Sequence, residues 1–304
     1  MNNALLSADF APLPNLAEPR WWTGTPALPP KLFTIDGDEF RVNGAPLEPS
    51  KELAERMQKT FNDVGLVHVI NTGLDKLQSM RLIATQVIKT QRDYEGGANP
   101  RKSLEANVYE VGAPLEAWLH YHHEMAYIGS STTMLGFLCH KMPSEGGYTF
   151  VSDSVQATNA ILATPFGQKL KDLGICYHRN LTDRRGFVGV PEVGVYNHWQ
   201  QSMMTEDPDE AIAEARKRGL DAEWGDNGLL KTRYTASAFE YFPQLDRNLL
   251  YSSMADDSAW FDTWPLVQHL PISDRPLKLT FGDGSEMTYD EKQLFLDVYD
   301  DYGI

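Results

Sequence analysis

Residues 119–127 read Leu-His-Tyr-His-His-Glu-Met-Ala-Tyr and hold the densest group of metal-binding side chains in the sequence. If this segment is an extended strand, side chains two positions apart share a face at a spacing of about 6.5 Å. His122 and Glu124 can then reach one metal ion, and His123 points to the opposite face. His120 shares the face of His122 and Glu124. However, three alternate positions span about 13 Å, which is too far for three metal bonds of about 2 Å. We therefore predict that His122 and Glu124 bind a metal together with a third ligand from elsewhere.

An imidazole and a carboxylate at this spacing supply two thirds of the facial triad that binds Fe(II) and leaves positions open for a co-substrate and dioxygen. The alternative is a polar strand end whose histidines are only hydrogen bonded, because short metal motifs also arise by chance. A zinc hydrolase is a further alternative, in which Glu124 is a ligand and another group is the base. Three histidines that are isolated in the sequence, His178, His198 and His269, are expected on the surface or satisfied in the core.

The runs that surround this segment decide between these alternatives. They are His-His-Glu-Met-Ala-Tyr at 122–127, Leu-Gly-Phe-Leu-Cys at 135–139, Gly-Gly-Tyr-Thr at 146–149, Asp-Ser at 153–154, Tyr-Glu-Gly-Gly-Ala-Asn-Pro-Arg at 94–101, Asn107, Lys-Thr at 231–232 and Thr-Phe-Gly-Asp-Gly at 280–284. Together they resemble the taurine dioxygenase and clavaminate synthase-like (TauD/TfdA) family of Fe(II)/2-oxoglutarate-dependent dioxygenases. The resemblance covers about residues 50 to 300.

The resemblance implies an α+β fold, a double-stranded β-helix (jelly roll) with flanking helices. It also implies that His122 and Glu124 are the first two iron ligands, and that Thr149 helps to hold a carboxylate of 2-oxoglutarate. The cofactor would be Fe(II), with 2-oxoglutarate and O2 as co-substrates. The reaction would hydroxylate or desaturate a small polar substrate, amino acid-like or acidic, while 2-oxoglutarate is decarboxylated to succinate. Arg101 binds substrate or is a solvated charge, and Asn107 lines the pocket or makes a backbone hydrogen bond.

The pattern of the remaining sequence fits one α+β domain with helices outside a sandwich or barrel. Apolar periodicity, caps and turn residues predict helices that begin near Pro49-Ser50 and cover residues 74–91, 155–173, 207–218 and 288–302. Strands are expected at residues 65–70, 175–181, 229–235, 248–252 and 277–281. Residues 1–48 are rich in proline and are predicted to form an arm packed on the body, and residues 49–304 to form the oxygenase domain.

The end of the sequence departs from the family pattern. Family members continue beyond the last helix with a segment that carries the third iron ligand and the arginine that pairs with the far carboxylate of 2-oxoglutarate, and neither is identifiable in these 304 residues. We therefore expect the domain to be incomplete at its C-terminus. The alternative is a non-catalytic homologue that acts as a binding or assembly protein.

The composition limits the classes of molecule that the protein is expected to bind. The formal net charge is −15, from 42 acidic and 27 basic residues, and no basic cluster or basic helix face is present. Nucleic acid and anionic membranes are therefore poor partners, and a small-molecule substrate is favoured. Neither a signal-peptide pattern nor a long apolar run occurs, so we predict a cytoplasmic protein. Cys139 and Cys176 are expected as small buried apolar residues, and the oligomeric state is open.

Overall fold

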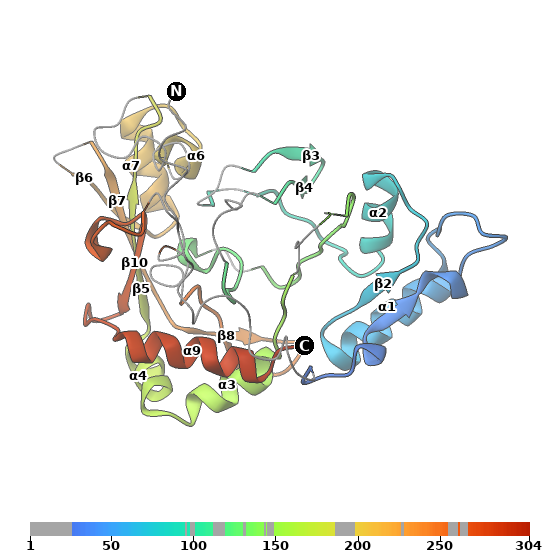
Figure 1. Cartoon of the computed structure of the whole chain (residues 1–304). Helices are drawn as coiled ribbons and strands as arrows, with labels where there is room; N and C mark the ends of the chain where they lie inside the picture. Colours follow the sequence, from blue (N-terminus) through green and yellow to red (C-terminus); the bar gives the residue numbers. More distant parts are fainter. Residues whose placement is uncertain are drawn as a thin grey trace.

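The computed structural model describes residues 26–304 except 95, 98–100, 112–118, 130–131, 143, 145–148, 186–197, 226–227, 255–260 and 262–266. The largest sheet is antiparallel and has the strand order β10-β5-β7-β6 (Figure 1). Its strands are β10 (Leu277–Phe281), β5 (Ile175–Leu181), β7 (Leu230–Ala236) and β6 (Asp221–Trp224). Because side chains alternate along a strand, each face of this sheet has its own set of residues. One face is mostly apolar and packs in the core, and the other is mostly polar.

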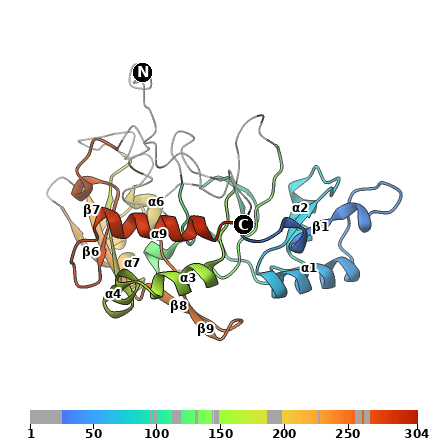
Figure 2. The same ribbon diagram turned by 60° about the horizontal axis from the view of Figure 1, so that its bottom comes forward.

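Three helices build the main core with the apolar face of this sheet. They are α3 (Ser154–Leu162), α4 (Pro165–Leu173) and α9 (Tyr289–Asp301), and they lie next to one another near one end of the sheet (Figures 1 and 2). Ile161 of α3, Leu170 of α4 and Phe295 of α9 are fully buried in the same cluster as Ile175 and Phe281 of the sheet. Burial of these side chains stabilises the fold mainly through the hydrophobic effect.

A second, smaller core forms at the end of β5 and the start of β7. Here α6 (Trp199–Met203) and α7 (Pro208–Lys217) bury Trp199 and Met203 against Leu181 and Leu230. As the sequence predicts, α7 begins at an Asp207 cap with proline at its first position, because an aspartate oxygen accepts from the first backbone N–H groups.

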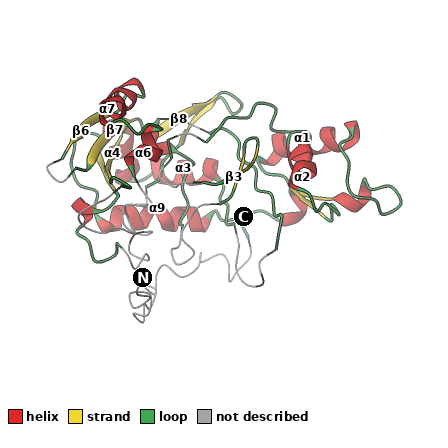
Figure 3. Ribbon diagram, turned by 90° about the horizontal axis from the view of Figure 1, so that it is seen from above, coloured by secondary structure: helices red, strands yellow, loops and turns green. Residues whose placement is uncertain are grey.

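The N-terminal part lies at the far end of the molecule from this sheet (Figure 3). It contains a parallel pair of strands, β1 (Thr34–Asp36) and β2 (His68–Ile70), with helices α1 (Lys51–Val64) and α2 (Leu77–Ala84) and short 3-10 helices η3 (Pro30–Leu32) and η4 (Gly37–Glu39). In the described part of the predicted arm, Ile35 and Leu47 pack against Leu53 of α1. Residues 1–25 lie outside the described residues.

Two hairpins complete the described strands. They are β3 (Ser103–Glu105) with β4 (Val108–Tyr109), and β8 (Phe239–Phe242) with β9 (Arg247–Leu250); the remaining 3-10 helices are η5 (Ala126–Ile128) and η7 (Ile272–Asp274). The fold class is therefore α+β, as predicted. The described strands form one four-stranded and three two-stranded sheets, an arrangement that does not by itself establish a jelly roll.

Two predicted helices are shorter than expected. The helix predicted over 74–91 ends at Ala84, where the β-branched residues Thr85, Val87 and Ile88 follow and weaken helix propensity. The helix predicted over 155–173 is divided into α3 and α4 before Pro165, because proline lacks the N–H that would continue the helix. Strands 175–181 and 277–281 are confirmed at both ends, as is the Thr288 capping box of α9.

Two further observations concern the surface. Cys139 is exposed and Cys176 is buried, so the expectation of a buried residue is wrong for Cys139. Within the residues that the structure describes, no helix combines the length and apolar character needed to cross a membrane.

Candidate metal centre

The segment that contains His122, His123 and Glu124 is not the extended strand on which the sequence prediction rested. Its residues belong to no strand, and it turns at Met125, whose φ of 61° lies in the left-handed region, before η5 begins. The turn is held from outside the segment, because the backbone N–H of His123 donates to the carbonyl oxygen of Ser252 at 2.9 Å. The different directions of neighbouring side chains here thus come from a turn and not from strand alternation.

His123 is partly buried and packed against the body of the protein. The N–H of Ser252 donates to its Nδ1 at 3.1 Å, its Nε2 lies 3.4 Å from Oγ of Ser154, and its ring centroid lies 4.9 Å from that of Tyr251. Burial lowers the pKa of His123 to about 4, opposed by the backbone contact with Ser252 and assisted by His122. His123 is therefore neutral at pH 7, and both of its ring nitrogens face polar neighbours, so it holds the segment on the body.

His122 is exposed and differs from His123 in how its ring is held. Its Nδ1 lies 2.7 Å from the backbone carbonyl oxygen of His120. Since a carbonyl oxygen can only accept, this contact assigns the proton to Nδ1 and leaves the lone pair of Nε2 directed elsewhere. Metal-binding histidines commonly show this arrangement, in which a hydrogen bond to one ring nitrogen fixes the tautomer and orientation of the other.

Glu124 is mostly buried and is paired with Arg101. Nη2 of Arg101 donates to Oε1 of Glu124 at 2.9 Å, and the two side chains are 23% and 15% exposed, respectively. The guanidinium of Arg101 also lies over the ring of Tyr94, 4.4 Å from its centroid. The backbone of Glu124 is held separately, because the hydroxyl of Tyr251 donates to its carbonyl oxygen at 2.7 Å. Two contacts thus fix this carboxylate and the backbone that carries it.

Two buried polar atoms beside this pair have no hydrogen-bond partner among the described residues. They are Nε2 of His120 and Nε of Arg101. Burial, and to a lesser extent the neighbouring His122, lowers the pKa of His120 to about 4, so its ring is neutral at pH 7. A buried polar atom without a partner typically costs about 1–3 kcal/mol. A ligand that supplied partners here would remove that cost, and the donor set of imidazole and carboxylate fits a transition metal.

The two predicted ligands, His122 and Glu124, are among the described residues, and a site of the predicted kind needs a third. Among them, no group of three histidine, cysteine, aspartate or glutamate side chains is arranged to hold a metal ion. His178 contacts Oγ1 of Thr280 on the sheet, His198 caps α6, and His269 is exposed. Of the described histidines, none is therefore placed as the third ligand.

The other predicted site residues are placed differently. Thr149 is exposed and outside regular secondary structure, and no hydrogen bond joins it to another described residue; the glycines expected to form the turn before it lie outside the described residues. Asn107 lies in the β3–β4 turn with φ of 59°, and its Nδ2 donates to Oε1 of Gln91 at 3.2 Å. Of the two predicted substrate-binding residues, the structure brings only Arg101 to Glu124.

Sequence reasoning missed the contacts that hold the centre. It left Arg101 as a solvated charge or a group that binds substrate, whereas its partner in the structure is the internal carboxylate of Glu124. It also gave no role to Tyr251. No local pattern marks either contact, since the residues are separated by 23 and 127 positions.

Comparison with known proteins gives one informative relative. No protein-family model matches the chain. A clavaminate synthase-like protein of Arabidopsis thaliana is 29% identical over 202 residues, which cover 65% of this chain and 58% of the relative. The matched region thus spans less than two thirds of that relative's length. The likeness is distant, and it supports an oxygenase only at the level of the family.

Proposed function

We propose that the chain is an Fe(II)/2-oxoglutarate-dependent oxygenase of the clavaminate synthase-like kind, with a jelly-roll fold. The observation that carries the proposal is that His122, whose Nδ1 is held and whose Nε2 has no hydrogen-bond partner among the described residues, is two positions from the oriented carboxylate of Glu124. The name of the Arabidopsis relative supports the same activity. The substrate would be a small polar molecule, amino acid-like or acidic.

Iron bound here would supply the oxidising chemistry, with O2 and with decarboxylation of 2-oxoglutarate to succinate. The residues of the chain bind and orient. His122 would bind through Nε2, and Glu124 through Oε2 while Oε1 keeps its hydrogen bond from Arg101. Thr149 would donate its hydroxyl to a carboxylate of 2-oxoglutarate. Because a guanidinium has five N–H donors, Arg101 keeps donors for an acidic substrate, and Asn107 keeps its Oδ1 as an acceptor.

The second candidate is a non-catalytic homologue that binds a ligand or a protein partner. It is favoured by a specific observation: the carboxylate of Glu124 already has a cationic partner, and the described residues place no third ligand beside it. A buried ion pair needs no metal to be satisfied. The two candidates differ in whether the protein binds one Fe(II) and then 2-oxoglutarate.

The test is an anaerobic titration with Fe(II) followed by 2-oxoglutarate, monitored by the metal-to-ligand charge-transfer band. We expect one Fe(II) per chain and a band that requires 2-oxoglutarate. His122→Ala and Glu124→Ala should both abolish the band, whereas His269→Ala, at an exposed histidine, should not. Thr149→Val should raise the 2-oxoglutarate requirement about ten- to a hundredfold and leave iron affinity unchanged. Absence of the band in every form would support the non-catalytic homologue.

A further inference from the structure

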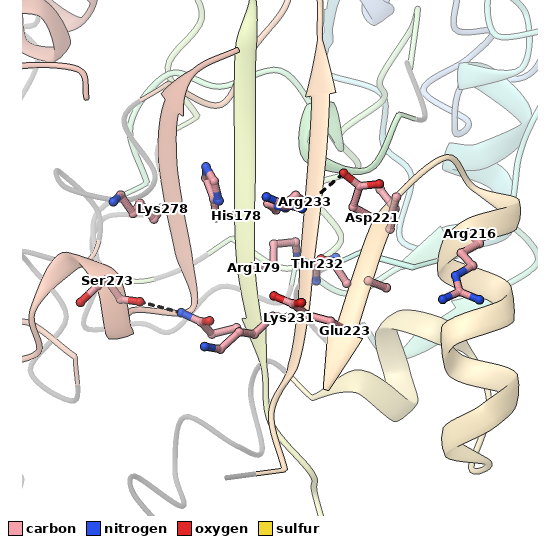
Figure 4. Close-up of a pocket in the computed structure, with 13 residues that line it drawn as sticks. His178, Arg179, Arg216, Asp221, Glu223, Lys231, Thr232, Arg233, Ser273 and Lys278 are labelled. Carbon is pink, nitrogen blue, oxygen red and sulfur yellow. Dashed lines mark hydrogen bonds and ion pairs between the residues drawn. The ribbon is translucent and has the colours of Figure 1, made fainter. Parts of the chain in front are cut away.

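A cavity of about 500 Å³ lies on the polar side of the four-stranded sheet (Figure 4). The alternation of β5 shows which side this is, since Tyr177 belongs to the main core while the neighbouring His178 lines the cavity. The cavity extends over the sheet from Lys278 of β10 to Arg216 of α7. Its volume is in the range of cavities that take small molecules.

The strand register places charged side chains in a row across this side. Lys278 of β10 is directly opposite His178 of β5, His178 is opposite Arg233 of β7, and Arg233 is opposite Asp221 of β6. Neighbouring strands are about 4.8 Å apart, so the two cations stand on either side of one imidazole. The two cations are thus about two strand spacings, or about 10 Å, apart, with the imidazole between them. A second row, Lys231 opposite Glu223, lies two residues along.

The cationic charges are only partly compensated within the protein. Four cationic side chains, on the polar side of the sheet and on α7, line the cavity against two acidic ones, although the chain as a whole has a net charge of −15. Arg179 also lines the cavity, but its guanidinium lies over the ring of Tyr127 on the core side. Arg233 is 3.7 Å from Asp221, and Lys278 is 2.7 Å from Glu286. Lys231 and Arg216 have no ion pair within 4 Å in the described part of the chain. The sign of the local charge is therefore opposite to that of the protein.

His178 is the group in this row that can change its charge. The hydroxyl of Thr280 donates to the carbonyl oxygen of Phe281, so Nε2 of His178 donates to Oγ1 of Thr280 at 3.0 Å and Nδ1 is the atom able to gain a proton. Burial, then Lys278 and then Arg233 lower the pKa of His178, and Glu286 opposes them. An anion bound between Lys278 and Arg233 would offset their effect, so the pKa of His178 would rise.

From these contacts we infer that the cavity binds a small anion with two or more negatively charged oxygens, of the kind found in phosphates and dicarboxylates. Arg233 offers two parallel N–H donors to such a group, and Lys231 offers a point charge beside it. A nucleic acid does not fit, because the net negative charge of the chain repels it. The His122–Glu124 segment lies on the other side of the sheet, because the hydroxyl of Tyr177 accepts from the N–H of Ser253, whose own hydroxyl donates to the carbonyl oxygen of His123. The cavity is therefore separate from the proposed oxygenase centre.

The experiment follows the C2 proton of His178 by NMR in the full chain, with chelator present to keep it free of metal. Inorganic phosphate and succinate are added separately at constant ionic strength. We expect a saturable shift with at least one of them, together with a rise in the pKa of His178. Which of the two saturates identifies the class of anion.

The variant that tests the site is Lys231→Ala with Arg233→Ala, both at exposed positions, so the fold should be kept. It should raise the half-saturating concentration by at least about tenfold. The matched control, Arg56→Ala with Lys59→Ala on the exposed side of α1, should not, and neither should His122→Ala. No saturation with either anion, or equal saturation in both double variants, would overturn the proposal without affecting the oxygenase assignment.

Discussion

The four-stranded sheet and the segment that carries His122 and Glu124 are held in place by different forces. In the sheet, β5 is paired on both edges, and Ile175 and Phe281 are completely removed from solvent. The His122–Glu124 segment has no strand pairing and is held by hydrogen bonds to residues 251–253 and by Arg101. Burial of a large side chain contributes several times more than one hydrogen bond. Stability and site geometry should therefore respond to different substitutions.

The largest effect is expected in the sheet. Phe281→Ala removes a fully buried ring from the main core and should lower the free energy of unfolding by about 3–5 kcal/mol. Phe137→Ala is the matched control, because Phe137 is 59% exposed, and it should change stability by less than about 0.5 kcal/mol. Urea unfolding measures both. Similar losses in the two variants would mean that this core is not what stabilises the chain.

Acid should destabilise the segment through two of its histidines. His120 and His123 have pKa values lowered to about 4, so they stay neutral in the folded chain while the unfolded chain takes up protons below pH 6.5. Stability is therefore full above pH 6.5 and falls as the pH decreases from 6.5 to 4, by up to about 3 kcal/mol per histidine. Urea unfolding between pH 7.5 and 4.5 measures the slope, which should be shallower in His123→Asn. If stability changes with pH equally in the wild type and in His123→Asn, His123 does not contribute to the acid sensitivity.

Removal of the Arg101 side chain should change metal affinity more than stability. A carboxylate ligand that loses its hydrogen-bonding partner binds metal more weakly, and Arg101→Gln should lower Fe(II) affinity about tenfold. The control is Arg56→Gln, at an exposed arginine of α1. Anaerobic titration gives both affinities. Tighter binding in Arg101→Gln would show instead that Arg101 competes with the metal for Glu124.

The smallest effect is expected at Tyr251. Its hydroxyl donates to the carbonyl oxygen of Glu124 and accepts from the N–H of Thr132 at 2.8 Å. Tyr251→Phe keeps the ring but loses both hydrogen bonds, and should cost about 1 kcal/mol of stability. Tyr289→Phe, at a tyrosine that is 55% exposed, should cost nothing measurable. Thermal unfolding would resolve the difference, and equal melting temperatures would contradict it.

The same contrast explains which features the sequence could predict. Strands 175–181 and 277–281 and the start of α9 follow from local patterns, namely apolar alternation, flanking glycines and a capping box. These patterns are complete within a few residues, so they are visible without the rest of the fold. The pairing of His122 and Glu124 was proposed from a motif of the same short length.

The geometry around that motif could not be predicted in the same way. The turn at Met125 depends on a hydrogen bond to Ser252, and the orientation of Glu124 depends on Arg101 and Tyr251. A strand rule applied to residues 119–124 contains no information on these distant partners. The polar side of the four-stranded sheet could be predicted only in part. The sequence predicted the strand at 175–181 that carries His178, but the position of His178 beside Lys278 and Arg233 depends on strand register.

The most direct test of the central claim uses the eight histidines of the chain as reporters of where a metal binds. Mn(II), added in less than stoichiometric amounts, broadens the NMR signals of protons close to it. We predict that the C2 proton of His122 broadens first, accompanied by those of its neighbours His120 and His123, while the signals of His178, His198 and His269 stay sharp. Broadening of the last three at the same Mn(II) concentration as His122 would contradict a metal centre at His122 and Glu124.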